Sequence, residues 1–311
     1  MAISTMSWAA EVSTYAVLPA GNNDSVTLDT SGNVYVSHTG SYVSEYNGTL
    51  VYQVASDGTI TEKAENLSGP LGNDFDSLGN LYISNFNSGD ITKVTPEGES
   101  SLLATLDSGG GIVINSNDEI FVASYYGNAI YQLNSQGDVH TLLQGNGLDG
   151  PVGLALDEDE NLYIGNYNNG KVFQIDSDLN INQIGQIPTV TGYITYASGD
   201  IYATGLNVDK IYKMSMGGDV EELVGTENTQ FSGPNGITAS TDGTLLYVSE
   251  YGGNVLHLID LTKTNDNDDD SSDNSALPPT SAPSSSGGGS MLFALAGLLL
   301  MNFAGKRKLT K

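Results

Sequence analysis

Short apolar runs separated by polar turns recur along the chain between residues 13 and 261. The pattern is clearest in residues 150–176, where Gly150 and Pro151 precede three such runs, Leu154–Leu156, Leu162–Ile164 and Val172–Ile175. Runs this short, bounded by turn-forming residues, predict β-strands rather than helices. Six variants of this stretch account for most of the sequence.

An aromatic residue occupies the same place in the second predicted strand of every variant. These residues are Tyr35, Tyr82, Phe121, Tyr163, Tyr202 and Tyr247, with spacings of 47, 39, 42, 39 and 45 residues. A period near 40 residues with about four strands per unit is typical of β-propeller blades. The spacing varies because insertions fall in loops, the longest at residues 38–47. The sequence therefore predicts an all-β protein, a six-bladed β-propeller.

A fourth, weaker strand ends each of the first five units but is missing from the sixth. The five strands are Thr59–Lys63, Leu102–Leu106, Val139–Leu143, Ile181–Ile187 and Val220–Val224. The sixth unit stops near Leu261, after a third strand at Asn254–Ile259, whereas Ser13–Leu18 stands before the first unit without a partner. We assign Ser13–Leu18 as the outer strand of the sixth blade, because this pairing closes the ring and removes a free sheet edge.

The charge of the chain limits its partners. It has 37 acidic and 10 basic residues, a formal net charge of -27, and its one arginine, Arg307, lies outside the predicted propeller. Such a surface repels phosphate backbones, so nucleic acid is excluded as a partner, and cations are its natural counter-ions. The absence of cysteine excludes disulfides, thiolate metal sites and cysteine nucleophiles. We expect a soluble, monomeric propeller.

The repeated pattern resembles the NHL repeat and its relatives among the gluconolactonase/regucalcin-like six-bladed propellers. The pattern is Gly-Pro-x-Gly, a short strand, Asp, a Gly-Asn type turn, Leu-Tyr-Ile, and Asn-Tyr or Asn-Phe, and the matching segments are Gly69–Gly72 with Leu78–Phe86, Gly150–Tyr167, and Gly233–Gly236 with Thr241–Tyr247. The similarity covers about residues 13–261. It implies the fold more firmly than the function, since this superfamily contains both enzymes and interaction scaffolds.

In such a fold, the inter-blade loops and the loops between second and third strands emerge on one face, around the mouth of the central channel. Aromatic and amide side chains there suit a small-molecule, glycan or peptide ligand, because rings stack on flat groups and amides both donate and accept hydrogen bonds. The candidate residues are Asn85, Phe86, Tyr125, Tyr126, Asn166, Tyr167, Glu250 and Tyr251. The alternative is that the same residues serve turns and packing between blades.

Lactonase-type relatives hold a divalent cation at the top of the channel, where it polarises a carbonyl and activates water. The resemblance implies that Asn235, within Pro234-Asn235-Gly236-Ile237, is one ligand of such a cation, calcium being the candidate. Asp24 stands near the ligand position of the first blade, and Asp74 lies three residues beyond that of the second. These three residues are the candidate metal ligands.

Several positions depart from the lactonase pattern. At the ligand positions of other blades, Leu71 and Val152 are apolar and Gly110 has no side chain, and the propeller contains no arginine to grip a substrate. The three histidines fall in an insertion, an outer strand and a third strand, so we expect surface or structural roles for them: His38, His140 and His257.

The two ends of the chain predict export. Residues 1–10 contain Ser7-Trp8-Ala9, the small-x-small spacing of a signal-peptidase site, and are interpreted as the remnant of a signal peptide, the alternative being an ordinary N-terminus. Residues 262–290 are interpreted as a disordered linker, acidic at first and then rich in proline and serine. Alternating aspartates at residues 266–270 suggest a calcium loop, but Ser271 replaces the glycine that such a loop needs.

Residues 291–311 consist of an apolar run followed by Lys306-Arg307-Lys308. The run at 291–305 is short for a membrane span, since at about 1.5 Å per residue it reaches about 22 Å of a roughly 30 Å core. With the preceding Gly287–Ser290, it resembles the GlyGly-CTERM sorting signal. The resemblance implies transient insertion in the inner membrane, cleavage by a rhomboid-type protease and delivery to the cell surface or the medium. The alternative is a short permanent anchor.

Two functions remain open. The first is an exported, surface-displayed or secreted propeller that binds a ligand or protein through its upper channel face. The second is an extracellular metal-dependent hydrolase of the lactonase type.

Overall fold

The structure, a computed structural model, describes residues 10–176, 179–224 and 230–264. The predicted signal remnant apart from Ala10, the predicted linker from residue 265 onward and the predicted sorting segment lie outside these residues. Among the described residues, no helix has the length and apolar character that a membrane crossing requires.

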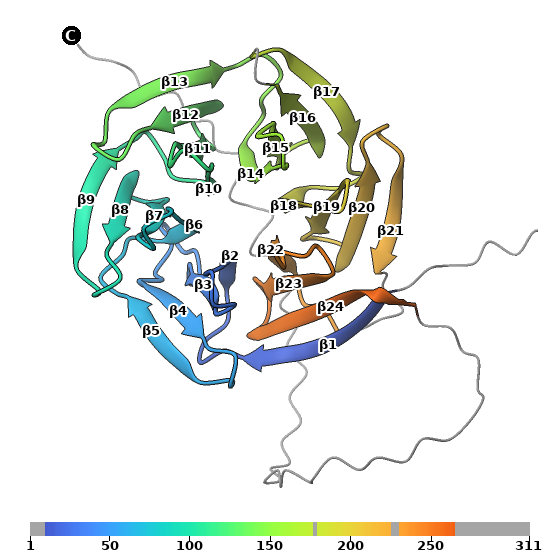
Figure 1. Cartoon of the computed structure of the whole chain (residues 1–311), viewed down its shortest axis with the longest axis horizontal. Coiled ribbons are helices and arrows are strands. Elements are labelled where there is room, and N and C mark those ends of the chain that lie inside the picture. The colour runs from blue at the N-terminus through green and yellow to red at the C-terminus, as the bar shows by residue number, and fades with distance from the viewer. Residues whose placement is uncertain (1–9, 177–178, 225–229, 265–311) are drawn as a thin grey trace, which may run out of the picture. The chain divides into compact units, whose positions relative to one another are not determined.

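Six four-stranded antiparallel sheets surround a central axis, as Figure 1 shows, and each sheet is one blade. Blade 1 contains β2 (Asn23–Leu28), β3 (Val34–His38), β4 (Leu50–Val54) and β5 (Ile60–Ala64). Blade 2 contains β6 (Pro70–Phe75), β7 (Leu81–Asn85), β8 (Asp90–Val94) and β9 (Ser100–Thr105). Blade 3 contains β10 (Ile112–Ile114), β11 (Ile120–Ser124), β12 (Ala129–Leu133) and β13 (Val139–Gln144).

Blade 4 contains β14 (Pro151–Leu156), β15 (Leu162–Asn166), β16 (Lys171–Ile175) and β17 (Ile181–Gln186). Blade 5 contains β18 (Thr191–Ala197), β19 (Asp200–Gly205), β20 (Lys210–Ser215) and β21 (Val220–Val224). In these five blades the strands follow the chain from the axis outward. The predicted six-bladed propeller is confirmed, and each of the six repeated aromatic residues lies in the second strand of its blade.

The sixth blade joins the two ends of the propeller. It contains β22 (Pro234–Ala239), β23 (Leu245–Glu250) and β24 (Val255–Thr264), and β1 (Ala10–Val17) is its outermost strand. The register places Val12 opposite Ile259, and the antiparallel pairing extends from Val17 to Ala10. This confirms the closing strand that the sequence predicts. Both strands are longer than expected, since Val12 pairs with Ile259, and Glu11 and Ala10 pair with Asp260 and Thr264.

In three of the six blades the second-strand tyrosine takes part in the same hydrogen-bonded turn. In blade 1, Asp29 Oδ2 accepts hydrogen bonds from Asn33 Nδ2 (2.7 Å) and from the Tyr35 hydroxyl (3.0 Å). The same three-residue arrangement is found at Asp76, Asn80 and Tyr82, and at Asp157, Asn161 and Tyr163. The tyrosine ring packs in the blade while its hydroxyl fixes the turn before it, so one residue serves both the core and the local turn.

Apolar side chains of neighbouring blades pack against one another. Ile130 of blade 3, for example, lies in one cluster with Ile164 and Phe173 of blade 4, all buried. A strand whose sheet is buried on both faces loses the alternation of polar and apolar residues.

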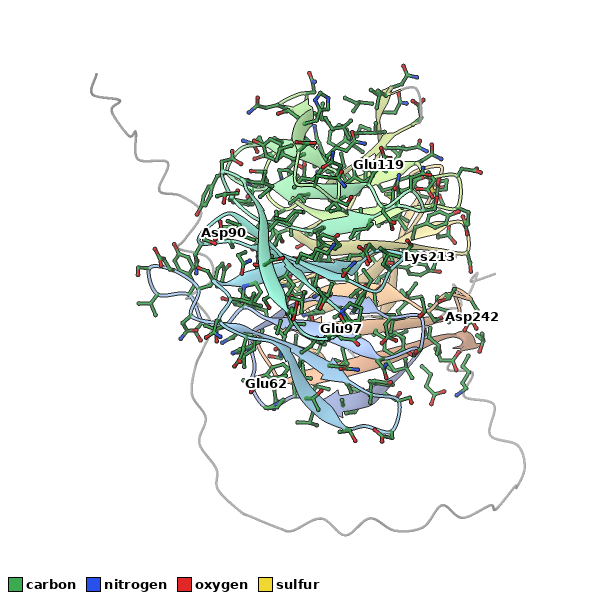
Figure 2. The ribbon with its side chains drawn as sticks, turned by 60° about the vertical axis from the view of Figure 1, so that its left-hand side comes forward. Glu62, Asp90, Glu97, Glu119, Lys213 and Asp242 are labelled. Atoms are coloured by element: carbon green, nitrogen blue, oxygen red, sulfur yellow. The ribbon has the colours of Figure 1, made fainter. Side chains whose placement is uncertain are left out.

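Figure 2 labels charged side chains on one side of the propeller, five acidic and one basic: Glu62, Asp90, Glu97, Glu119, Asp242 and Lys213.

The innermost strands of adjacent blades approach closely where a glycine faces the neighbouring backbone. A Cβ on Gly236 of β22 would lie 2.1 Å from the Asp24 carbonyl oxygen of β2, a distance no side chain tolerates. At the same place, the Ser249 hydroxyl donates a hydrogen bond to that carbonyl oxygen and accepts one from the Gly236 N–H (3.0 Å). This contact fixes the residues beside it, Asp24 and Asn235, at the start of the two strands.

Candidate functional site

The innermost strands all begin at the same end of the channel, which we call the upper mouth. The strand register identifies the equivalent positions at this mouth. In each blade, one residue of the innermost strand pairs with the second-strand aromatic, and the equivalent position lies three residues before it. These positions are Asp24, Leu71, Gly110, Val152, Gly192 and Asn235. Only two of the six carry polar side chains. Because blades 6 and 1 are neighbours, Asn235 and Asp24 lie next to each other.

Asp24 is the buried acid of the upper mouth, with 4% of its surface exposed. Burial raises the pKa of its carboxyl group to about 7, although contacts with the Tyr193 and Thr39 hydroxyls and the Asn235 amide lower it in part. The Tyr193 hydroxyl is buried and faces Asp24, but it makes no hydrogen bond of standard geometry. The groups with the largest influence on Asp24 are thus all uncharged.

Five aromatic rings lie around the upper mouth, and we call them the aromatic arc: Tyr46, Phe86, Tyr125, Tyr167 and Tyr251. Neighbouring ring centroids are 5.4–6.5 Å apart, in the order Tyr251, Tyr46, Phe86, Tyr125, Tyr167. Burial, with a smaller effect of the Asp24 charge, raises the pKa of both Tyr167 and Tyr251 to about 12. Each ring comes from the loop after the second strand of a different blade.

Sequence reasoning missed Tyr46, which lies in the long insertion between β3 and β4. Asn87 of blade 2 holds it in place, because Asn87 Oδ1 accepts from the Tyr46 N–H (3.1 Å) and Asn87 Nδ2 donates to the Tyr46 carbonyl oxygen (2.8 Å). The insertion contains a second aromatic, Tyr42, whose ring centroid is 5.0 Å from that of Tyr46. Two tyrosines in an otherwise polar insertion were the available signal.

The candidate binding residues divide into two groups. Phe86, Tyr125, Tyr167 and Tyr251 belong to the aromatic arc, and Tyr126, 63% exposed, lies beside it with its ring centroid 5.3 Å from that of Phe86. The remaining three are buried beneath the face: Asn85, Asn166 and Glu250.

Two of these buried residues tie loops to strands. Asn85 Oδ1 accepts from the Ser68 N–H of the inter-blade loop (2.9 Å), and its Nδ2 donates to the Asp90 carbonyl oxygen (2.9 Å). Asn166 Nδ2 donates to the Gly147 carbonyl oxygen of the next inter-blade loop (2.9 Å). These contacts correspond to the alternative role, turns and packing between blades.

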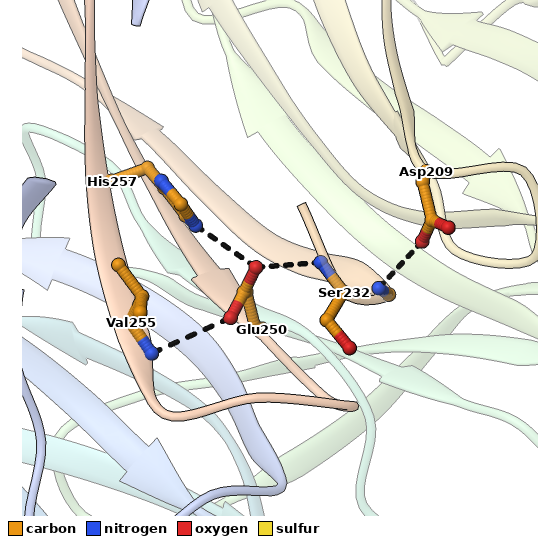
Figure 3. Close-up of polar contacts among 6 residues, drawn as sticks. Asp209, Ser232, Glu250, Val255 and His257 are labelled. Carbon is orange, nitrogen blue, oxygen red and sulfur yellow. Dashed lines mark hydrogen bonds and ion pairs between the residues drawn. The ribbon is translucent and has the colours of Figure 1, made fainter. Parts of the chain in front are cut away.

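Glu250 forms a buried pair with His257, as Figure 3 shows. Its Oε1 accepts from the Ser232 N–H (2.6 Å) and from His257 Nε2 (2.9 Å), and its Oε2 accepts from the Val255 N–H (3.4 Å). His257 Nδ1 is buried without a partner, so the hydrogen-bond network assigns the proton of a neutral ring to Nε2. Glu250 fills the position that Asn85 has in blade 2 and holds the hairpin that carries Tyr251. His257 has the structural role that the sequence predicts.

Asp74 lies apart from the other two candidate metal ligands. It is three residues farther along its strand than the position equivalent to Asp24, about 10 Å down the channel at roughly 3.3 Å per residue. Its oxygens accept from the Thr27 hydroxyl (3.1 Å) and from the N–H groups of Phe75 (2.9 Å) and Ile114 (2.8 Å). It lines a cavity of about 180 Å³ in the lower channel, where burial raises its pKa to about 6.

The residues present do not fit a divalent cation. Calcium takes about six to eight oxygen ligands, several of them ionised carboxylates. The upper mouth brings together one carboxyl group, from Asp24, and one amide, from Asn235, while Asp74 is committed to three hydrogen bonds elsewhere. Within the described ranges, no group of three or more histidine, cysteine, aspartate or glutamate side chains is placed to hold a metal ion.

Known structures share the fold. A gluconolactonase of Xanthomonas campestris aligns with a TM-score of 0.67 at 15% identity, covering 84% of this chain and 93% of that one. Virginiamycin B lyase of Staphylococcus aureus aligns at 0.61 and 17%, covering 81% and 99%. A chain of the nidogen/laminin complex aligns at 0.62 and 19%, covering 70% and 89%. Identities this low show the fold alone. No protein-family model and no curated protein matches the chain.

The Asp24 carboxyl predicts a pH-dependent stability. Its folded pKa of about 7 exceeds the ordinary 3.8, so between these values the folded protein binds more protons than the unfolded one. The free energy of unfolding therefore falls as pH rises and levels off above pH 7. When the pH rises from 5.5 to 7.5, we expect this group to lower the free energy of unfolding by on the order of 2 kcal/mol. Asp24→Asn should remove that slope in urea unfolding.

Glu97→Gln, in an exposed turn, is the matched control and should keep the wild-type slope. A profile for Asp24→Asn that parallels the wild type over this pH range would contradict the assigned environment of Asp24.

Proposed function

We propose that the propeller is a binding module whose ligand site is the upper mouth. The observation that carries the proposal is that all six blades place an aromatic residue there, five in the aromatic arc and the sixth, Tyr193, beside Asp24. Scaffold packing alone does not require an aromatic in every blade at one end of the channel. Six convergent aromatics above one buried acid are typical of a concave ligand site.

The ligand would be a small molecule, a glycan or a peptide. Flat faces of a sugar or peptide group stack on tyrosine and phenylalanine rings, while the tyrosine hydroxyls and the Asn235 amide offer directional hydrogen bonds. A chain of the nidogen/laminin complex has this fold, so the fold is compatible with a protein partner.

A hydrolase is the second candidate, and one observation favours it. A carboxyl group with a pKa of about 7 lies in the range suited to general acid-base catalysis near neutral pH, and Asp24 faces the Tyr193 hydroxyl. The fold is also that of a gluconolactonase. Against this stands the absence of a fitting metal donor set among the described residues.

A glycan and peptide array probed with the full chain tests the binding function. A ligand found there should bind Tyr167→Ala at least about tenfold more weakly in calorimetry, a loss of roughly 1.4 kcal/mol. Tyr196→Ala, at the lower end of the channel, is the matched control and should bind like the wild type. Equal weakening by both variants would refute the upper mouth as the site, and lactone turnover abolished by Asp24→Asn would favour the hydrolase.

We further propose that the chain is exported and reaches the cell surface or medium after a rhomboid-type protease removes the C-terminal segment. The support is the sequence of residues 287–311, which lies outside the described residues. Mass spectrometry of surface or secreted material should find a C-terminus near Gly287–Ser290. Intact Lys311 in that material would refute the cleavage.

A further inference from the structure

We infer that the group bound at the upper mouth is an alkylammonium cation, held by the faces of the aromatic arc and by the carboxylate of Asp24. The inference rests on the proposed binding function and specifies the chemical class of its ligand. It depends on the charge of the site, the arrangement of the rings and the Tyr193 hydroxyl, which lies beside Asp24.

Above about pH 7 the upper mouth contains a negative charge that no cationic side chain of the described residues is shown to balance. Asp24 is 4% exposed, and the groups that influence it most are the Tyr193 and Thr39 hydroxyls and the Asn235 amide, all neutral. The propeller has no arginine. Among its lysines, Lys210, Lys213 and Lys263 pair with carboxylates within blades 5 and 6. A buried carboxylate without a counter-charge is costly, so a cationic ligand that pairs with it gains correspondingly.

The aromatic arc supplies the second element of cation recognition. The faces of aromatic rings are electronegative and attract cations within about 6 Å of the ring centroid. Three of the four neighbouring pairs in the arc stand nearly at right angles, 85° for Tyr46 and Tyr251 and 79° for both Tyr46–Phe86 and Tyr125–Tyr167, and Phe86–Tyr125 is tilted at 54°. Rings set at right angles point their faces in different directions, which suits a compact cation better than one flat stack does.

Tyr193 connects the two elements. Its side chain is 4% exposed, and burial and the Asp24 carboxyl raise the pKa of its hydroxyl, with a smaller effect of the Tyr46 hydroxyl, so Tyr193 lies near both the acid and the arc. The hydroxyl faces the Asp24 carboxyl and makes no hydrogen bond of standard geometry with any other described residue. A hydroxyl that donates to a carboxylate still has acceptor capacity, which a ligand can use.

Other ligand classes satisfy these observations less well. A divalent metal ion needs more oxygen donors than one carboxyl and one amide provide. A neutral sugar stacks on the rings but leaves the Asp24 charge unpaired. An anion is repelled by Asp24 and by the net charge of -27. An alkylammonium group has both an apolar surface for the rings and a positive charge for the carboxylate.

Choline and its neutral isostere 3,3-dimethylbutan-1-ol test the inference, because they share shape and differ in charge. With the full chain at pH 8, we expect calorimetry to give choline at least about tenfold higher affinity than the isostere. Asp24→Asn should abolish this preference by weakening choline alone. A trimethyllysine peptide measured in parallel identifies the source: tighter binding than choline supports a peptide-borne ammonium, and weaker binding supports a free small molecule.

Two substitutions at one position test whether a loss of choline binding is caused by misfolding. They are Tyr167→Phe and Tyr167→Ala. The Phe variant keeps the aromatic face and should bind choline like the wild type, whereas the Ala variant should lose about tenfold or more. Equal affinity for choline and its isostere, or no binding of any ammonium probe, would overturn the inference. The proposed binding function is judged separately by the array, so a neutral ligand that depends on Tyr167 would leave it standing while the ammonium class fails.

Discussion

Deletion of residues 1–18 is expected to prevent the propeller from folding into a stable monomer. The deletion removes β1, so β24 loses its whole antiparallel partner from Val255 to Thr264. It also removes the buried side chains of Ala10, Val12 and Leu18. Burying a large aliphatic side chain contributes about 1.5–3 kcal/mol. With the lost pairing, the deletion costs on the order of 5 kcal/mol or more, comparable with the whole stability of an ordinary domain.

Urea unfolding followed by circular dichroism measures this loss, and size-exclusion chromatography reports association through the exposed edge of β24. Deletion of residues 1–9 alone is the matched control and should unfold like the full chain. A peptide of residues 10–18 added in trans should raise the melting temperature of the deletion variant in a concentration-dependent way. The ring closure would be contradicted if both deletions unfolded at the same urea concentration.

Glu250→Ala is expected to destabilise the propeller by about 3–5 kcal/mol. The reason is that three donors lose their acceptor together: the N–H groups of Ser232 and Val255, whose hydrogen bonds are partly buried, and the fully buried Nε2 of His257. His257 and Glu250 each expose 2% of their side chains, so water does not replace the carboxylate without local opening. Urea unfolding at pH 7 gives the loss directly.

Glu250→Gln retains one accepting oxygen but turns an amide N–H toward a donor, so its loss should be intermediate. Glu97→Ala, in an exposed turn, should change stability by less than about 0.5 kcal/mol. A Glu250→Ala variant as stable as Glu97→Ala would show that the pair is dispensable. The experiment also distinguishes the structural role of Glu250 from a place on the binding face, since a surface residue would not be this costly to remove.

Glu250 shows that a residue's position within a repeat is not enough to predict whether it contributes to a binding site. Asn85, Asn166 and Glu250 stand next to arc residues in the sequence, so all were candidates for the binding face. In a strand, neighbouring side chains point to opposite sides, and these three lie at the strand end where the side chain faces the inter-blade loop. The aromatic residue that follows each of them is in the loop and reaches the upper mouth.

The sequence by itself determined the blade count, the strand order within each blade and the closing strand. The blade count and the strand order depend on contacts that are local in the chain, such as the turn at Asp29, Asn33 and Tyr35, and such contacts leave a pattern of turn residues, apolar runs and aromatics at fixed spacing. The closing strand could be predicted because the sixth unit has only three strands of its own, whereas the strand before the first unit has no partner there.

Only the tertiary structure decided which of the candidate residues meet. Asp24 and Asn235 lie 211 residues apart in the chain, yet ring closure makes them neighbours, whereas Asp74 turns its carboxyl to Thr27 and Ile114 in the lower channel. Tyr46 enters the aromatic arc because Asn87 of the next blade holds its loop. The physical reason is the same in each case: contacts between blades depend on the packing of the closed ring, and a repeat pattern that is local in the sequence carries no record of them.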